Sequence, residues 1–204
     1  MRTSFDFARA HVLRSLLVLT AVTLIGGCGI FSPDEGGETP VDPPAPWVLA
    51  ETPEQFAINF RRCWEERNIE EYENLLSENF IFRLSSADID EGEVGFWGRA
   101  QEIRTAEFMF GIESTPPELT VESIEFTRWE INLPWTGEVN DPQFEDAEFV
   151  ATYTVELTAT IAGDPEPVKG NQRLYIKREA ITVDGEEVSV FRLRAWEDLG
   201  TTVN

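Results

Sequence analysis

Residues 149–161 read FVATYTVELTATI, and their side chains alternate between two kinds. The odd positions from Phe149 to Ile161 are apolar or aromatic, whereas the even positions from Thr152 to Thr160 are threonine or glutamate. A period of two is typical of a β-strand with one buried face. Burying a large apolar side chain contributes roughly 1.5 to 3 kcal/mol. We therefore predict that the odd set is the more buried one and faces the first and third helices of the domain.

More strands are predicted on both sides of this one. Residues 119–129 alternate with one phase slip near Ser123, which indicates a bulge. A turn at 163–167 leads to a strand through Val168 and Ile176, and Asp184-Gly185 is typical of a tight hairpin before a last strand at 187–197. The second half of the chain is therefore predicted to form an antiparallel meander.

Helical patterns dominate the region before these strands. Thr52 and Gln55 can form a capping box around Pro53, and an apolar stripe follows it at helical spacing: Phe56, Phe60, Cys63 and Trp64. Asn68 can cap a second helix whose core side chains are Ile69, Tyr72, Leu75 and Leu76.

A short strand at 80–84 and a third helix complete the first half. The helix is predicted to begin near Trp97 and to end at Gly111, with Ile103, Ala106 and Phe110 as its buried stripe. The predicted class is α+β, with three N-terminal helices packed on a curved, mainly antiparallel sheet.

Three segments resemble one known superfamily. WEERNIEEYENLLSENFIFRL (64–84), FWGRAQEIRTAEFMF (96–110) and FRLRAWEDL (191–199) are similar to the nuclear transport factor 2-like fold, which includes ketosteroid isomerase and SnoaL-like cyclases. The resemblance spans residues 51–199, so we assign 51–204 to one such domain. It implies a cystatin-like cone, an apolar pocket between sheet and helices, and often a homodimer through the sheet. Because this fold hosts enzymes and binding proteins alike, it does not determine the function.

The N-terminus has the pattern of a bacterial lipoprotein signal. A basic leader and an apolar run at 15–25 precede Ile25-Gly26-Gly27-Cys28, which resembles a lipobox. This predicts a signal peptide at 1–27, cleavage between Gly27 and Cys28, and lipid on Cys28. An ordinary signal peptide or an uncleaved anchor is the alternative. Residues 28–50 are rich in proline and glycine and are predicted to be a tether.

The expected location is therefore the cell envelope. Gly29 is not the aspartate that retains enteric lipoproteins at the inner membrane, so the outer membrane facing the periplasm is favoured.

The chain is strongly acidic, with 16 Lys+Arg and 38 Asp+Glu residues and a formal net charge of −22. Removal of residues 1–27 takes away three arginines and one aspartate, which leaves a net charge of −24. Such a surface repels polyanions, so binding to nucleic acid is excluded. The acidity also fits a solvated surface or adaptation to salt.

Few side chains suit catalysis or metal binding. The single histidine, His11, leaves with the signal peptide, so the mature chain has no imidazole for a base or a metal, and no cofactor is predicted. Cys63 lies on an apolar stripe and is predicted to be a core thiol. The acidic loop at 88–93 places its glycine one position early for a calcium loop.

Five residues are candidates for lining a pocket: Tyr153, Trp97, Arg192, Arg194 and Trp196. Arg192, Arg194 and Trp196 are expected to share one strand face, which suits an amphiphile with one anionic end, such as a fatty acid, if that face lines the cone. The alternatives are a core tyrosine at 153 and an outward-facing arginine pair.

Two functions remain open at this point. The first is a non-catalytic, lipid-anchored domain that binds a small apolar ligand or a protein partner. The second is a histidine-free isomerase, dehydratase or epoxide hydrolase that uses pocket carboxylates. Aromatic side chains stand where the first helix of an isomerase would need a tyrosine, which favours the first.

Overall fold

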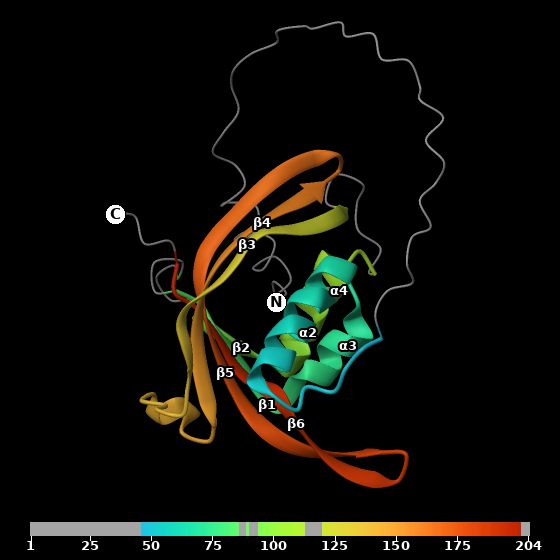
Figure 1. Ribbon diagram of the computed structural model, residues 1–204. Coiled ribbons are helices and arrows are strands. Elements are labelled where there is room, and N and C mark those ends of the chain that lie inside the picture. Colours follow the sequence, from blue (N-terminus) through green and yellow to red (C-terminus); the bar gives the residue numbers. More distant parts are fainter. Residues whose placement is uncertain (1–45, 86–88, 90–93, 113–119, 201–204) are drawn as a thin grey trace, which may run out of the picture. The chain divides into compact units, whose positions relative to one another are not determined.

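Helices α2, α3 and α4 pack against one face of a curved six-stranded sheet (Figure 1). The computed structural model describes residues 46–85, 89, 94–112 and 120–200. Within them the helices are α2 (Pro53–Glu66), α3 (Ile69–Leu75) and α4 (Arg99–Met109). The strands are β1 (Leu76–Arg83), β2 (Phe96–Gly98), β3 (Val121–Thr136), β4 (Phe149–Ile161), β5 (Asp164–Val183) and β6 (Glu186–Asp198). The α+β class is confirmed.

The sheet is mixed, with the order β2-β1-β6-β5-β4-β3. Each of the strands from β3 to β6 pairs antiparallel with the next, which confirms the predicted meander. The first strand, β1, pairs parallel with β6 and antiparallel with β2. Strand β6 therefore lies beside β1, the strand that follows α2 and α3.

Both predicted helix starts are confirmed. The Thr52 hydroxyl accepts a hydrogen bond from the Gln55 backbone N–H at 3.2 Å, and the Gln55 side chain accepts one from the Thr52 N–H at 2.9 Å. At the second start, Asn68 Oδ1 accepts from the Glu71 N–H at 3.1 Å. These bonds satisfy backbone donors that the first turn of a helix leaves free.

The predicted burial of β4 is also confirmed. Ala151, Tyr153, Val155 and Ala159 of the odd set are buried, whereas Thr152 is the one even residue of the strand that is buried. The expected helix partners need correction, because the main strand contacts of α4 are with β1 and β2. The Tyr153 ring reaches the first helix indirectly, through Trp135, which contacts Phe56 of α2.

Several element bounds differ from the prediction. The turn predicted at 163–167 is shorter and lies earlier. The hairpin turns at Ala162-Gly163, and β5 already begins at Asp164. Trp97 lies in the short strand β2 and not in the third helix. The predicted slip near Ser123 is confirmed as a register shift, but β3 continues to Thr136.

The face of the sheet opposite the helices, called the outer face below, carries residues 137–148 (Figure 1). This cover segment joins β3 to β4 and contains the short 3₁₀ helix η2 (Pro142–Phe144). Phe144 is fully buried and packs with Ala147, Tyr175 and Ala195 in a second small core. The sheet is thus covered on both faces over its centre.

Residues 1–45 lie outside the described part of the chain, and so do the predicted cleavage site at Gly27 and Cys28 and most of the acidic loop at 88–93. Residues Val48–Asn204 form one compact unit. Within the described ranges, none of the helices has the length and apolarity needed to span a bilayer.

Candidate functional site

A buried carboxyl group, that of Glu102, lies between the helices and the sheet. Its Oε1 accepts a hydrogen bond from the Tyr72 hydroxyl at 2.6 Å, and its Oε2 accepts one from the Trp97 indole N–H at 2.7 Å. Glu102 is only 2% exposed. Helix α4 supplies the acid, α3 the hydroxyl and β2 the indole, so three elements meet at one group.

The surroundings change the acidity of this pair. Burial raises the pKa of Glu102, although the hydrogen bonds from Tyr72 and Trp97 oppose that shift. Burial and the nearby Glu102 also raise the pKa of Tyr72 well above its usual value. A carboxyl with a raised pKa can serve as a general acid or base, but both oxygens of Glu102 already have donors. A substrate would have to displace one of them.

Glu102 was not among the predicted site residues, although its spacing could have revealed it. Glu102, Ala106 and Phe110 are four residues apart, so they lie on one side of α4. The apolar stripe Ile103, Ala106 and Phe110 passes over Glu102, since glutamate is rarely buried without a partner. One partner, Tyr72, lies 30 residues away in the sequence, and the other, Trp97, lies five residues away but in the separate strand β2.

Aromatic rings occupy the space around the carboxyl. Trp196 of β6 contacts the rings of Phe60, Trp64 and Phe82 edge-on, with centroids 5.1 to 5.7 Å apart. Phe82 in turn stacks on Trp97 at 4.2 Å. Such offset and edge-to-face pairs stabilise a core beyond the area that they bury. The interior at this point is a packed aromatic core.

Tyr153, Trp97 and Trp196 all face the helix side of the sheet. Tyr153 stacks on Trp129 with centroids 4.8 Å apart. Burial raises the pKa of Tyr153 to about 12, so its hydroxyl stays protonated at neutral pH. Tyr153 belongs to the part of this core that lies between the sheet and α2.

The prediction that Arg192, Arg194 and Trp196 share one face is wrong. Leu193 pairs with Ile176, and Ala195 pairs with the preceding residue, Tyr175, so Arg194 is an extra residue in β6. A one-residue bulge reverses the faces of the side chains that follow it. Arg192 and Arg194 consequently lie on the outer face, opposite to Trp196.

Both arginines have acidic partners on that face. Arg194 Nε donates to Asp146 of the cover segment at 2.8 Å, and its Nη1 donates to the Asn79 carbonyl at 2.7 Å. The Arg192 Nε lies 3.5 Å from a Glu179 carboxylate oxygen. The pair therefore neutralises acidic neighbours and does not form a basic spot inside the cone.

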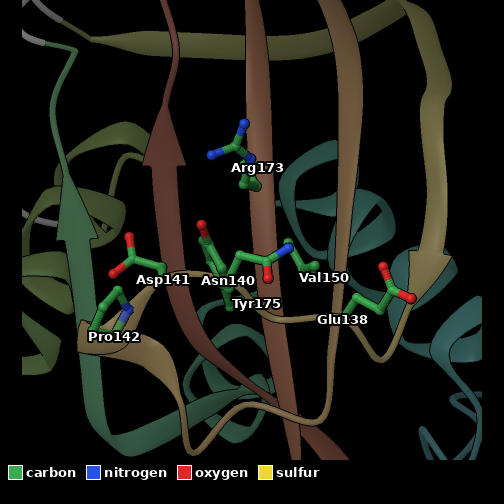
Figure 2. A pocket seen from close by; sticks show the side chains of 7 residues that line it. All are labelled: Glu138, Asn140, Asp141, Pro142, Val150, Arg173 and Tyr175. Atoms are coloured by element: carbon green, nitrogen blue, oxygen red, sulfur yellow. The ribbon is translucent and has the colours of Figure 1, made fainter.

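An open concavity of about 430 Å³ lies on the outer face, beside the cover segment (Figure 2). Two strands, the cover segment and both signs of charge contribute to its lining: Glu138, Asn140, Asp141, Pro142, Val150, Arg173 and Tyr175. A second concavity, of about 520 Å³, lies at the start of α4 between Glu78 and Gln101.

An ion network forms one side of the first concavity. Glu197 accepts from Arg173 Nη1 at 3.0 Å and from Arg83 Nη1 at 3.1 Å, and Arg83 also donates to Asp141 at 2.8 Å. The Arg83 guanidinium lies over the Phe144 ring, 4.5 Å from its centroid. This network fixes the Arg173 side chain at the rim of the concavity.

The described residues contain no cluster of three or more histidine, cysteine or acidic side chains that could hold a metal ion. Cys63 is fully buried, and burial together with nearby carboxylates raises the pKa of its thiol. This confirms the expectation of a core thiol, since the reactive form is the thiolate.

No protein-family model and no curated protein matches the sequence. Solved structures are similar to it in fold. An NTF2-like protein of unknown function in nutrient uptake from Rhodospirillum rubrum is 10% identical, with a TM-score of 0.43 over 72% of this chain and 95% of that one. A ketosteroid isomerase-like protein from Erwinia carotovora atroseptica is 12% identical, with a TM-score of 0.47 over 72% and 94%. An NTF2-like protein from Cytophaga hutchinsonii is 12% identical, with a TM-score of 0.39 over 72% and 94%.

Two of these three structures are described as NTF2-like and the third as ketosteroid isomerase-like, and identities this low concern the fold alone. The nuclear transport factor 2-like resemblance implied an apolar pocket between sheet and helices. In the part of the chain that the structure describes, aromatic side chains pack against one another there, and the 430 Å³ concavity lies on the outer face.

Proposed function

We propose that this protein is a lipid-anchored component of the bacterial envelope whose globular domain binds a small ligand on its outer face and catalyses no reaction. The observation that carries the proposal is the contrast between the two faces of the sheet. The only buried acid of the described core, Glu102, has both oxygens bound by Tyr72 and Trp97. Three charged side chains, Glu138, Asp141 and Arg173, line the concavity on the other face.

The composition of the site supports binding without turnover. The mature chain has no histidine, and its core thiol is buried with a raised pKa. Burial alone would raise the pKa of Asp141 at the concavity, but hydrogen bonds from Arg83 and the Gln143 backbone N–H outweigh it and lower that pKa, which disfavours proton transfer at neutral pH. Arg173, Tyr175 and Val150 instead offer a charged donor, an aromatic ring and an apolar surface, as ligand sites commonly do.

The test is native mass spectrometry of the full protein extracted from membranes in a non-ionic detergent. We expect a co-purifying small molecule that is lost in Arg173→Gln and kept in Glu102→Gln, with circular dichroism showing that both variants are folded. A molecule that is lost in Glu102→Gln and kept in Arg173→Gln would contradict the proposal and would move the site to the interior.

The lipid anchor rests on the sequence Ile25-Gly26-Gly27-Cys28 and on the tether that follows it. Two or more acyl chains on one residue would hold the protein at the membrane, since each buried methylene contributes about 0.8 kcal/mol. We expect metabolic labelling with a palmitate analogue to mark the wild type and Cys63→Ala, but not Cys28→Ala. Equal labelling of the wild type and Cys28→Ala would contradict the anchor.

One observation favours a histidine-free enzyme as the second candidate. Glu102 has a raised pKa and a tyrosine hydroxyl at 2.6 Å, which are the parts of an acid–base pair. The pair would need access to a substrate through the aromatic core. The Glu102→Gln outcome described above separates this candidate from the binding domain.

A further inference from the structure

The outer-face concavity carries opposite charges at separate places on its rim. Figure 2 shows Arg173 at one end, with Asp141 and Glu138 on two other sides and Asn140, Val150 and Tyr175 between them. The positive group comes from β5, whereas both negative groups come from the cover segment. A ligand that fills the concavity would therefore meet both signs.

The positive end has capacity for a second carboxylate. The side chain of Arg173 is 36% exposed, its Nη1 donates to Glu197, and the Tyr175 hydroxyl is a second hydrogen-bond partner. A guanidinium has five N–H donors in a fixed fork, a geometry that matches carboxylates. Glu197 is itself shared with Arg83, so Arg173 is only partly neutralised.

The two acidic residues at the negative end differ in whether other side chains hold their carboxylates. Asp141 is held by Arg83 at 2.8 Å and by the Gln143 backbone N–H at 2.9 Å. Glu138 is exposed, and no partner within the described residues is recorded for its carboxylate. The strong negative charge of the chain also raises the local concentration of cationic groups in such a cleft. Glu138 is therefore suited to an ammonium group.

The register of the strands sets the distance between the two ends. Thr136 of β3 pairs with Val150, and Val150 pairs with Tyr175 of β5. Two strand spacings separate β3 from β5, which is about 10 Å. Glu138 follows Thr136 by two residues, and Arg173 precedes Tyr175 by two, so their backbones are at least this far apart. Val150 and Tyr175 lie between them and provide apolar surface (Figure 2).

We propose that this concavity binds a zwitterionic ligand whose ammonium and carboxylate groups are at least about 10 Å apart and are joined by an apolar chain. The carboxylate pairs with Arg173 and the ammonium with Glu138. This proposal rests on the proposed function and names the ligand class of the same site. An α-amino acid is too short for it, because its two charged groups share one carbon atom.

The test measures the binding of four matched probes to the full chain by isothermal titration calorimetry, with detergent alone as the blank. The probes are 8-aminooctanoate, octylamine, octanoate and β-alanine. We expect 8-aminooctanoate to bind with a Kd at least tenfold lower than each of the others, because only it satisfies both ends at once. Octylamine or octanoate binding as tightly as 8-aminooctanoate would overturn the proposal, as would the absence of binding.

Three variants locate the binding. Arg173→Gln should raise the Kd of 8-aminooctanoate about tenfold, to that of octylamine, and Glu138→Gln should raise it to that of octanoate. Arg178→Gln is the control, because Arg178 is also an arginine of β5 but lies over Phe191, pairs with Glu148 and does not line the concavity. An equal effect in Arg178→Gln would overturn the assignment. If 8-aminooctanoate fails while the co-purified molecule still requires Arg173, the ligand class is wrong and the proposed function stands.

Discussion

Glu102 shows how one residue can tie three elements together. In Glu102→Gln the amide oxygen can still accept one of the two hydrogen bonds from Tyr72 and Trp97. The amide N–H₂ group replaces the other carboxylate oxygen and faces a donor, so the second hydrogen bond is lost. Leaving a buried donor without an acceptor costs about 1 to 3 kcal/mol. We expect the free energy of unfolding to fall by this amount at pH 7, as measured by urea denaturation. An unchanged midpoint would show that Tyr72 and Trp97 find other acceptors.

The pH dependence of the same variant has a definite sign. The pKa of Glu102 is raised on folding, so the folded state holds its proton more tightly than the unfolded state. The contribution of Glu102 to stability therefore falls as the pH rises above its ordinary pKa of 4.5. Consequently, the stability difference between the wild type and Glu102→Gln should be larger at pH 5 than at pH 8.

Single residues also mark the limit of what the sequence could predict. The caps at Thr52 and Asn68 follow from neighbours within three positions, so local chemistry determines them. The side on which Arg194 lies depends on a bulge whose cause is the pairing of β6 with β5. Arg192, Arg194 and Trp196 are spaced two residues apart, which puts side chains on one face of a regular strand. For this reason the pattern predicted one face for all three of its candidate residues.

At the scale of elements, the cover segment is held by one ring. Phe144 is fully buried against Tyr175, with ring centroids 4.7 Å apart. Truncation of a buried phenylalanine costs about 3 kcal/mol or more. We expect Phe144→Ala to lower the free energy of unfolding by about 3 kcal/mol and to speed amide hydrogen exchange within 137–148.

The matched control is Phe96→Ala, since Phe96 is 55% exposed in β2. Its effect should stay below about 0.5 kcal/mol. Similar losses in both variants would show that Phe144 does not anchor the segment.

The elements themselves were largely predictable where one face is buried. The alternation in β4 gave its register because only one register buries the aromatic side chains. The start of β5 was missed because Pro165 and Pro167 suggested a turn. Both prolines pair only with β4, and the pairing of β6 begins farther along, at Gln172. A proline fits a strand where its missing N–H has no partner to serve.

At the scale of the whole molecule, acid should loosen the outer face. Burial alone would raise the pKa of Asp146, but hydrogen bonds from Asn79 and Arg194 outweigh it and lower that pKa below 3.8. A lowered pKa stabilises the fold above the ordinary value and loses that contribution as the pH falls through it. We expect Asp146→Asn to cost about 1 kcal/mol at pH 7, a value reduced for solvent screening, and almost nothing below pH 3. A constant difference across this range, measured by chemical denaturation, would contradict the ion pair with Arg194.

The net charge of the whole chain gives a second molecular prediction. Repulsion among the acidic residues opposes the compact state, and added salt screens it over about 10 Å at 0.1 M. We expect the midpoint of thermal unfolding to rise when sodium chloride increases from about 0.05 to 0.5 M. An equal concentration of a neutral osmolyte is the control for solvent effects. A midpoint that falls with salt would show that the ion networks outweigh the repulsion.

The parallel pair between β1 and β6 has a consequence for how the chain folds. Ile81 pairs with Ala195, 114 residues later in the sequence. Contacts between residues this far apart in the sequence form slowly, because the intervening chain loses much conformational entropy before the contact forms. During synthesis the first helices and β1 emerge long before their central partner strand. A nascent chain therefore cannot complete its sheet until strand β6 has been made.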